Sequence, residues 1–159
     1  MIEVQVEDAG WRVALPEAES LAEAAAGAAL AALAEPMAGD LVILLTNDAE
    51  VQALNARYRG KDQPTNVLSF PAGPNPHGHL GDVALALGVC KAEAKAQGKP
   101  LADHLRHLVA HGVLHLVGYD HEAEAEAETM EALEREILAG LGVPDPYRPP
   151  DSELDGDHA

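Results

Sequence analysis

Apolar residues along the chain form several short runs of strand length. Alternation over residues 2–6 predicts a strand, and the GWRVAL that follows is expected to extend it or to pair with it. The fully apolar run LVILL, residues 41–45, predicts a strand buried on both faces in the middle of a sheet. Two further strands are predicted over residues 66–70 and 82–87.

Helices are predicted between and after these strands. Pro16 opens an Ala- and Leu-rich segment up to Glu35, at a first-turn position where a missing N–H costs least. Asp48 can cap a second helix. Three more helical segments follow, over residues 89–97, 100–117 and 123–138. Because aromatic residues make up only 3% and Ala-rich stretches favour helices, the expected fold is a helix-rich α/β or α+β fold.

The length of 159 residues, with 47% hydrophobic residues, suits one core and is short for two. We therefore expect a single domain over residues 1–142. After Gly142 the proline and acid content predicts a flexible tail over residues 143–159. The proline- and glycine-rich segment 71–81 is expected to be a loop at one rim of a site.

Nothing in the sequence indicates a membrane or an oxidising compartment. No segment approaches the roughly 18 apolar residues that span a bilayer, and the N-terminus lacks the pattern of a signal peptide. The one cysteine, Cys90, has no partner for a disulfide and is expected to be a small buried apolar residue. These features predict a cytoplasmic protein.

The formal net charge of −17 argues against binding nucleic acid by bulk electrostatics. The charge is uneven, however. Residues 57–106 include seven basic and four acidic residues. From Asp120 onward the chain has thirteen acidic residues and two basic ones. A locally positive surface is therefore possible on an acidic protein, although ordinary solvated helix faces would explain the same pattern.

The most informative stretch is HGVLHLVGYDH, residues 111–121. Residues four apart on a helix are neighbours, so His111 and His115 can direct ring nitrogens at one ion. Gly118 can adopt the left-handed conformation that ends a helix, which lets His121 return to the same point. Three histidines leave a fourth position open, as in catalytic zinc sites. The pattern predicts one metal ion per chain, zinc or another divalent transition metal, at the end of a helix.

The same spacing resembles the H-x-x-x-H-x-x-G-x-x-H motif of metzincin metalloproteases. Those enzymes carry a glutamate directly after the first histidine as general base, and here that position is Gly112. Because glycine cannot transfer a proton, the sequence argues against a peptidase.

Several motifs together resemble the YbeY family of bacterial rRNA-maturation endoribonucleases. They are HGVLHLVGYDH, LNARYRGKDQPTNVLSFP at residues 54–71, Leu80-Gly81-Asp82, the acidic helix, and DPY at residues 145–147. The likeness extends over roughly residues 40–147. It implies a sandwich of helices around a small, mostly parallel mixed sheet, with the metal site at the end of a central helix.

The resemblance also implies roles for individual residues. His111, His115 and His121 would bind the metal ion, and Arg59, in the YRGKD element, would have an essential role. A guanidinium is suited to hold phosphoryl oxygens, although a structural ion pair is the alternative for Arg59. Asp82 and Asp120 are candidates for moving a proton or orienting a histidine, and with Arg59 and His111 they complete the candidate catalytic set. His104 and His107, on nearly the same helical face, could support the ligands.

The function that the resemblance implies is metal-dependent cleavage of single-stranded RNA, in 16S rRNA 3′-end maturation and ribosome quality control. Its expected partners are an rRNA precursor, ribosomal particles and ribosomal proteins. The attacking group is open between metal-activated water and the RNA 2′-hydroxyl. Three alternatives remain: a ribosome-assembly factor with little cleavage, a hydrolase of small phosphorylated or amide substrates and, least favoured, a metzincin-like peptidase.

Overall fold

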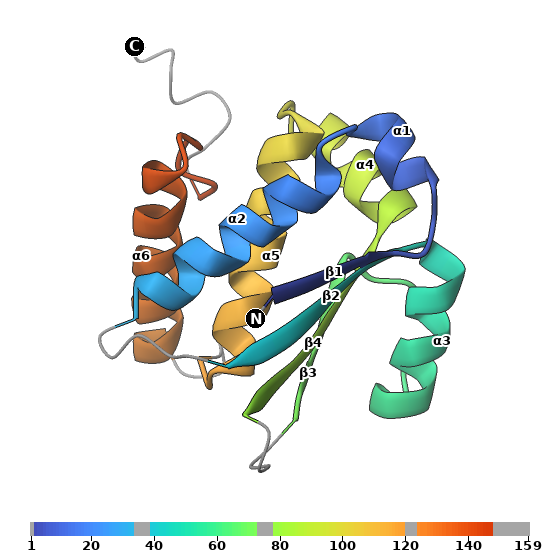
Figure 1. Cartoon of the computed structure of the whole chain (residues 1–159), viewed down its shortest axis with the longest axis horizontal. Helices are drawn as coiled ribbons and strands as arrows, with labels where there is room; N and C mark the ends of the chain where they lie inside the picture. Colours follow the sequence, from blue (N-terminus) through green and yellow to red (C-terminus); the bar gives the residue numbers. More distant parts are fainter. Residues whose placement is uncertain (1, 34–38, 73–77, 120–123, 148–159) are drawn as a thin grey trace.

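A computed structural model describes residues 2–33, 39–72, 78–119 and 124–147, and shows an α/β fold (Figure 1). Its strands are β1 (Ile2–Val6), β2 (Asp40–Thr46), β3 (Val67–Pro71) and β4 (His79–Ala86). Its helices are α1 (Gly10–Ala14), α2 (Ala18–Ala31), α3 (Asp48–Arg59), α4 (Leu87–Ala96), α5 (Leu101–Leu116) and α6 (Glu124–Gly140). None of these helices combines the length and apolar character needed to cross a bilayer.

The four strands form one sheet in the order β1-β2-β4-β3. β1 pairs with β2 and β2 with β4 in parallel, whereas β3 pairs with β4 antiparallel and forms an edge. The expected small, mostly parallel mixed sheet is therefore confirmed. The segment predicted as a loop up to Gly81 is shorter, because β4 already begins at His79.

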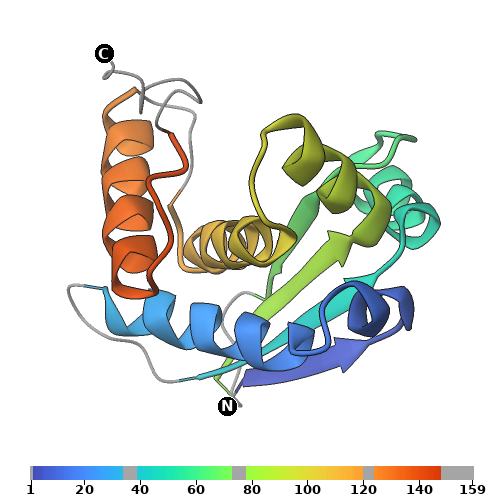
Figure 2. The same ribbon diagram turned by 90° about the horizontal axis from the view of Figure 1, so that it is seen from above.

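Helices cover the two faces of the sheet unequally. On one face α5 lies between the sheet and α6, and α2 runs beside it, while α3 lies on the opposite face (Figures 1 and 2). In β2, Leu41, Ile43 and Leu45 are buried in the core with α2 and α5. Val42 and Leu44 point the other way and are only half-buried. The prediction that this strand is buried on both faces was thus wrong for the α3 face, which one helix covers only in part.

The segment after β1 differs from its predicted strand conformation. Gly10–Ala14 form helix α1, which follows a turn where the Gly10 N–H donates to the Asp8 carboxylate at 2.7 Å. The indole of Trp11 is fully buried, and its N–H donates to the Thr46 carbonyl at 2.8 Å. The Trp11 ring reaches the core from helix α1, so the prediction that this segment extends the first strand or pairs with it was wrong.

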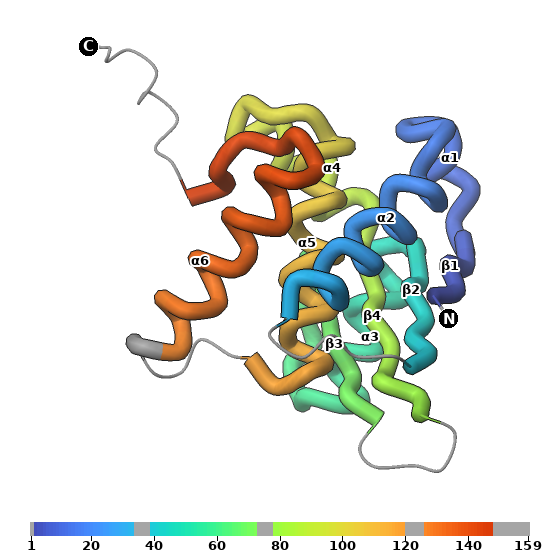
Figure 3. Tube along the Cα trace, turned by 60° about the vertical axis from the view of Figure 1, so that its left-hand side comes forward, coloured from blue at the N-terminus to red at the C-terminus, as the bar shows by residue number. Residues whose placement is uncertain are grey.

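The start of the predicted tail also differs. Val143 is buried and the Tyr147 ring packs in T-shaped geometry against His107 of α5. Val143 and Tyr147 thus contact the helices at the start of the segment that was predicted to be flexible. Figure 3 traces the backbone of residues 143–147 after α6. Residues 148–159 lie outside the described part of the chain.

Cys90 matches its expected role. It is fully buried in the core at the start of α4, and burial raises the pKa of its thiol to about 12. A thiol held in this protonated form is a poor nucleophile.

Candidate functional site

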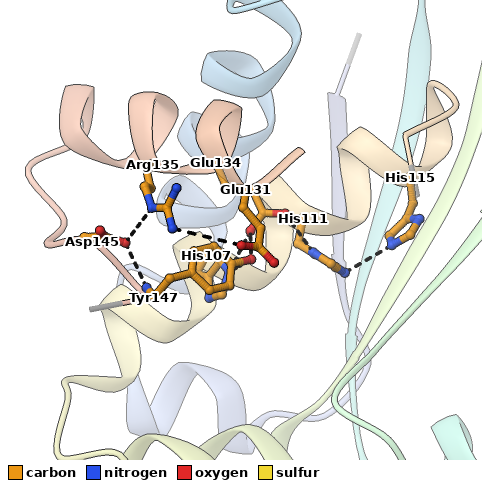
Figure 4. Close-up of polar contacts among 8 residues, drawn as sticks. All are labelled: His107, His111, His115, Glu131, Glu134, Arg135, Asp145 and Tyr147. Carbon is orange, nitrogen blue, oxygen red and sulfur yellow. Dashed lines mark hydrogen bonds and ion pairs between the residues drawn. The ribbon is translucent and has the colours of Figure 1, made fainter. Parts of the chain in front are cut away.

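Helix α5 presents a row of histidines, His104, His107, His111 and His115, along one side. The Nε2 atoms of His111 and His115 lie 3.1 Å apart (Figure 4). Two nitrogen ligands of one tetrahedral zinc ion, each at its usual bond length, lie roughly 3.3 to 3.4 Å apart. The pair therefore fits two ligand positions on a single ion. His121 and Asp120 lie outside the described residues, and within the described ones no group of three candidate ligands is formed.

Behind this pair lies a buried carboxylate, that of Glu134 in α6 (Figure 4). One of its oxygens lies 2.9 Å from His111 Nδ1, and the other lies 2.9 Å from His107 Nε2 and accepts from the Tyr147 hydroxyl. An ionised carboxylate only accepts hydrogen bonds, so His111 must carry its proton on Nδ1. In the neutral ring this leaves a lone pair on Nε2, the atom that faces His115.

The charge of Glu134 is set by these contacts. Burial alone raises the pKa of the carboxyl, but the hydrogen bonds from His107, His111 and Tyr147 together outweigh it and lower the pKa to about 2. Burial and the neighbouring carboxylate raise the pKa of the Tyr147 phenol, which therefore stays a donor. The network thus holds a fixed negative charge directly behind His111.

Glu134 was missed by the sequence analysis, although the sequence carries a signal for it. It follows Met130 by four residues, on the stripe of α6 that also carries Ile137 and Leu138. A charged residue on the apolar stripe of an amphipathic helix needs a buried partner. That partner is the histidine row. His107 shares the Glu134 carboxylate with His111, whereas His104 pairs with Glu93 at 2.8 Å, so a role of either in supporting metal ligands stays a prediction.

The histidine pair opens into a cavity of about 190 Å³ between α5 and the edge strand β3. Arg59 lines the same cavity from the end of α3, and its Nη2 donates to the Ser69 carbonyl at 2.7 Å. Gly60 ends α3 with φ +71°, a left-handed conformation that glycine adopts readily, so the helix stops with Arg59 at the cavity. No carboxylate of the described residues forms an ion pair with Arg59, so nothing in them supports the ion-pair alternative.

Asp82 lies on the other face of the sheet. It lines a neighbouring cavity on the α3 side, together with Arg59, and its carboxylate lies 3.1 Å from His79 Nε2. It does not line the cavity of His111 and His115. The histidine that Asp82 contacts is thus His79 and not one of the predicted ligands. Asp82 faces away from α5, because its neighbour Val83 packs against Gly112 of α5 and successive residues of a strand point to opposite faces.

Gly112 also has a packing role. A Cβ at this position would lie 2.8 Å from Val83 Cγ1 and 3.2 Å from the Ser69 hydroxyl, which itself donates to the Gly112 carbonyl. The position faces strands β3 and β4 of the sheet. A glutamate here, as in the metzincins, would clash with Val83 unless the sheet shifted, which agrees with the argument against a peptidase.

The fold and this cavity define an α/β protein whose candidate site brings two imidazoles and a guanidinium to one cavity. The chain belongs to the endoribonuclease YbeY family, because the family model "Endoribonuclease YbeY" matches residues 3–142.

Individual relatives agree with this assignment. The Endoribonuclease YbeY of Azorhizobium caulinodans is 54% identical over 155 residues, which cover 94% of this chain and 97% of that protein. The protein of the same name from Chelativorans sp. is 54% identical over 132 residues, which cover 80% of this chain and 81% of that protein. The solution structure of TM1509 from Thermotoga maritima covers 93% of this chain and 99% of its own, with a TM-score of 0.55 and 24% identity. This last likeness supports the fold.

Proposed function

We propose that the protein is a metal-dependent endoribonuclease that cuts single-stranded RNA. We propose further that it acts in 16S rRNA 3′-end maturation and in ribosome quality control. The observation that carries the proposal is that His111, His115 and Arg59 line one cavity. The names of its relatives, which are endoribonucleases at about 54% identity, support the same reaction class.

The residues that would hold the metal ion are His111 and His115, with His121 as the predicted third ligand. Bound there, zinc or another divalent transition metal supplies Lewis acidity towards a phosphoryl oxygen and lowers the pKa of a water molecule towards ~7. Glu134 fixes the His111 tautomer, so that Nε2 offers its lone pair to the cavity.

Arg59 would hold the phosphodiester. One of its N–H groups is used on the Ser69 carbonyl, and the other donors of the guanidinium stay available for phosphate oxygens. Attack on the phosphorus adds negative charge to these oxygens, so a guanidinium placed beforehand stabilises the transition state more than the ground state.

Glu134 provides a prediction that does not depend on cleavage. Glu134→Gln should weaken metal binding about 10- to 100-fold, because the amide can no longer accept from both histidines and the tyrosine. Glu136→Gln, which removes the same charge from an exposed position of α6, is the matched control. Competition with a chromogenic chelator measures both affinities. Equal metal affinity for the two variants would argue against a ligand-orienting role for Glu134.

The expected substrate is an unpaired strand, because the cavity between α5 and β3 requires a backbone that can bend into it, which a stacked duplex resists. With a net charge of −17 the protein should bind free RNA weakly, and less at higher salt, so ribosomal particles would present the strand. Wild-type protein loaded with zinc should cut labelled single-stranded RNA, and leave duplex RNA, DNA and casein intact. Cleavage of casein would instead support a peptidase.

The acidic charge also favours a second candidate, a ribosome-assembly factor with little intrinsic cleavage. The two functions differ in whether replacement of the histidines changes RNA cleavage on ribosomal particles. If the protein bound ribosomal particles equally well with and without the metal site, and cut no RNA on them, the assembly role would replace the nuclease role.

A further inference from the structure

A second cavity, of about 660 Å³, opens on the α3 face of the sheet beside the histidine cavity. We call it the Tyr58 cavity, after the side chain of α3 that lines it. Arg59, Ser69 and Pro71 line both cavities, so only the edge strand β3 separates them. The side chains found in the Tyr58 cavity alone include Leu44, Leu54, Tyr58, Phe70 and Asp82.

Its aromatic lining is unusually exposed. Tyr58 is 58% exposed and, with Val13, is one of two large apolar side chains that are exposed within the described residues. The Tyr58 ring packs edge-on against Phe70, with centroids 5.5 Å apart, and the Arg57 guanidinium lies 5.2 Å from its centroid. The Arg59 guanidinium lies 6.0 Å from the Phe70 centroid. Exposed aromatic rings interleaved with arginines are the surface on which unpaired bases stack.

The positive charge near this cavity favours a nucleic-acid strand, whereas the net negative charge of the whole protein does not. Arg57, Arg59 and Lys61 lie within five residues at the end of α3, on a chain with a net charge of −17. No acidic residue of the described part forms an ion pair with any of the three. Asp82, the one acid that lines the cavity, can accept a hydrogen bond from the amino group of a base.

From these contacts we propose that the Tyr58 cavity binds a nucleobase of the RNA strand, next to the phosphate that is cut. Arg59 lines both cavities, so a strand whose phosphate contacts this guanidinium can pass over the β3 edge and place the adjoining base on Tyr58. This inference rests on the proposed function, since it assigns part of the same substrate. It gives the protein a way to hold RNA that its overall charge does not provide.

The test measures binding of a labelled single-stranded RNA and of a series of the same strand, in each of which one nucleotide at a different position is abasic. Wild-type protein should lose roughly 5- to 150-fold in affinity when the abasic nucleotide occupies one position. Tyr58→Ala should lose a similar factor on the intact strand, and lose nothing more on that abasic strand. Tyr58→Phe should keep nearly full affinity, because the ring remains. Val13→Ala, which trims the other exposed apolar side chain, should bind as wild type does.

The inference would be overturned if Tyr58→Ala bound the intact strand as tightly as wild type does. It would also be overturned if the abasic nucleotide lowered the affinity of Tyr58→Ala by the same factor as that of wild type. A loss of binding to ribosomal particles but not to RNA would assign the cavity to a protein partner instead. The proposed function fails in a different way. If wild type shows the abasic effect but cuts no RNA, the base site stands and the nuclease role is wrong.

Discussion

Arg59→Ala should lower the rate of RNA cleavage by roughly 10²- to 10³-fold, which is the usual cost of losing one preorganised donor to a developing anion. Its melting temperature and metal content should stay near those of wild type. The physical reason is that Arg59 is exposed and makes one hydrogen bond, to the Ser69 carbonyl, which water can replace. Cleavage assays, thermal unfolding and metal analysis of the same preparation measure all three quantities.

Two further variants make the Arg59 result specific. Arg59→Lys should recover little activity, because a point charge cannot hold a phosphate through two parallel hydrogen bonds. Arg12→Ala, which removes an exposed arginine that pairs with Glu19, should leave cleavage unchanged. If Arg59→Ala unfolded the protein, its role would be structural.

His115→Ala should abolish stoichiometric metal binding. Wild-type protein is expected to retain about one transition-metal ion per chain after dialysis, and the variant almost none, because two ligands of an open site hold a metal much more weakly than three. His79→Ala is the matched control, since His79 contacts Asp82 on the other face of the sheet. Elemental analysis measures the metal content. Full metal content after replacement of His115 would exclude it as a ligand.

Much of this site could be predicted from local sequence. The spacing of His111 and His115 specifies neighbouring rings on any helix, and their nitrogens do approach one another. The YRGKD element marks the end of α3, and Gly60 provides the left-handed turn that places Arg59. Such features depend on residues close in sequence, so they can be predicted without knowledge of the tertiary fold. The roles of these residues in metal binding and catalysis stay predictions.

Other features depend on contacts between distant segments. Glu134 meets His111 across 23 residues of sequence, and only the packing of α6 on α5 joins them. Asp82 is separated from the histidine pair because its side chain lies on the α3 face of β4, whereas α5 packs against the opposite face of the sheet. The Tyr58 cavity depends on how α3 packs on its face of the sheet. These relations require the tertiary fold, which periodicity and capping signals do not define.

The role of the histidine cavity in RNA cleavage can be measured with one labelled single-stranded RNA, incubated with wild-type protein or with His115→Ala, the two being purified in parallel and supplied with the same zinc. We expect that wild type cuts the strand, that a chelator stops the cleavage, and that the variant leaves the RNA intact although it is folded. Equal cleavage by the two proteins would contradict the claim that the histidine cavity is the nuclease site.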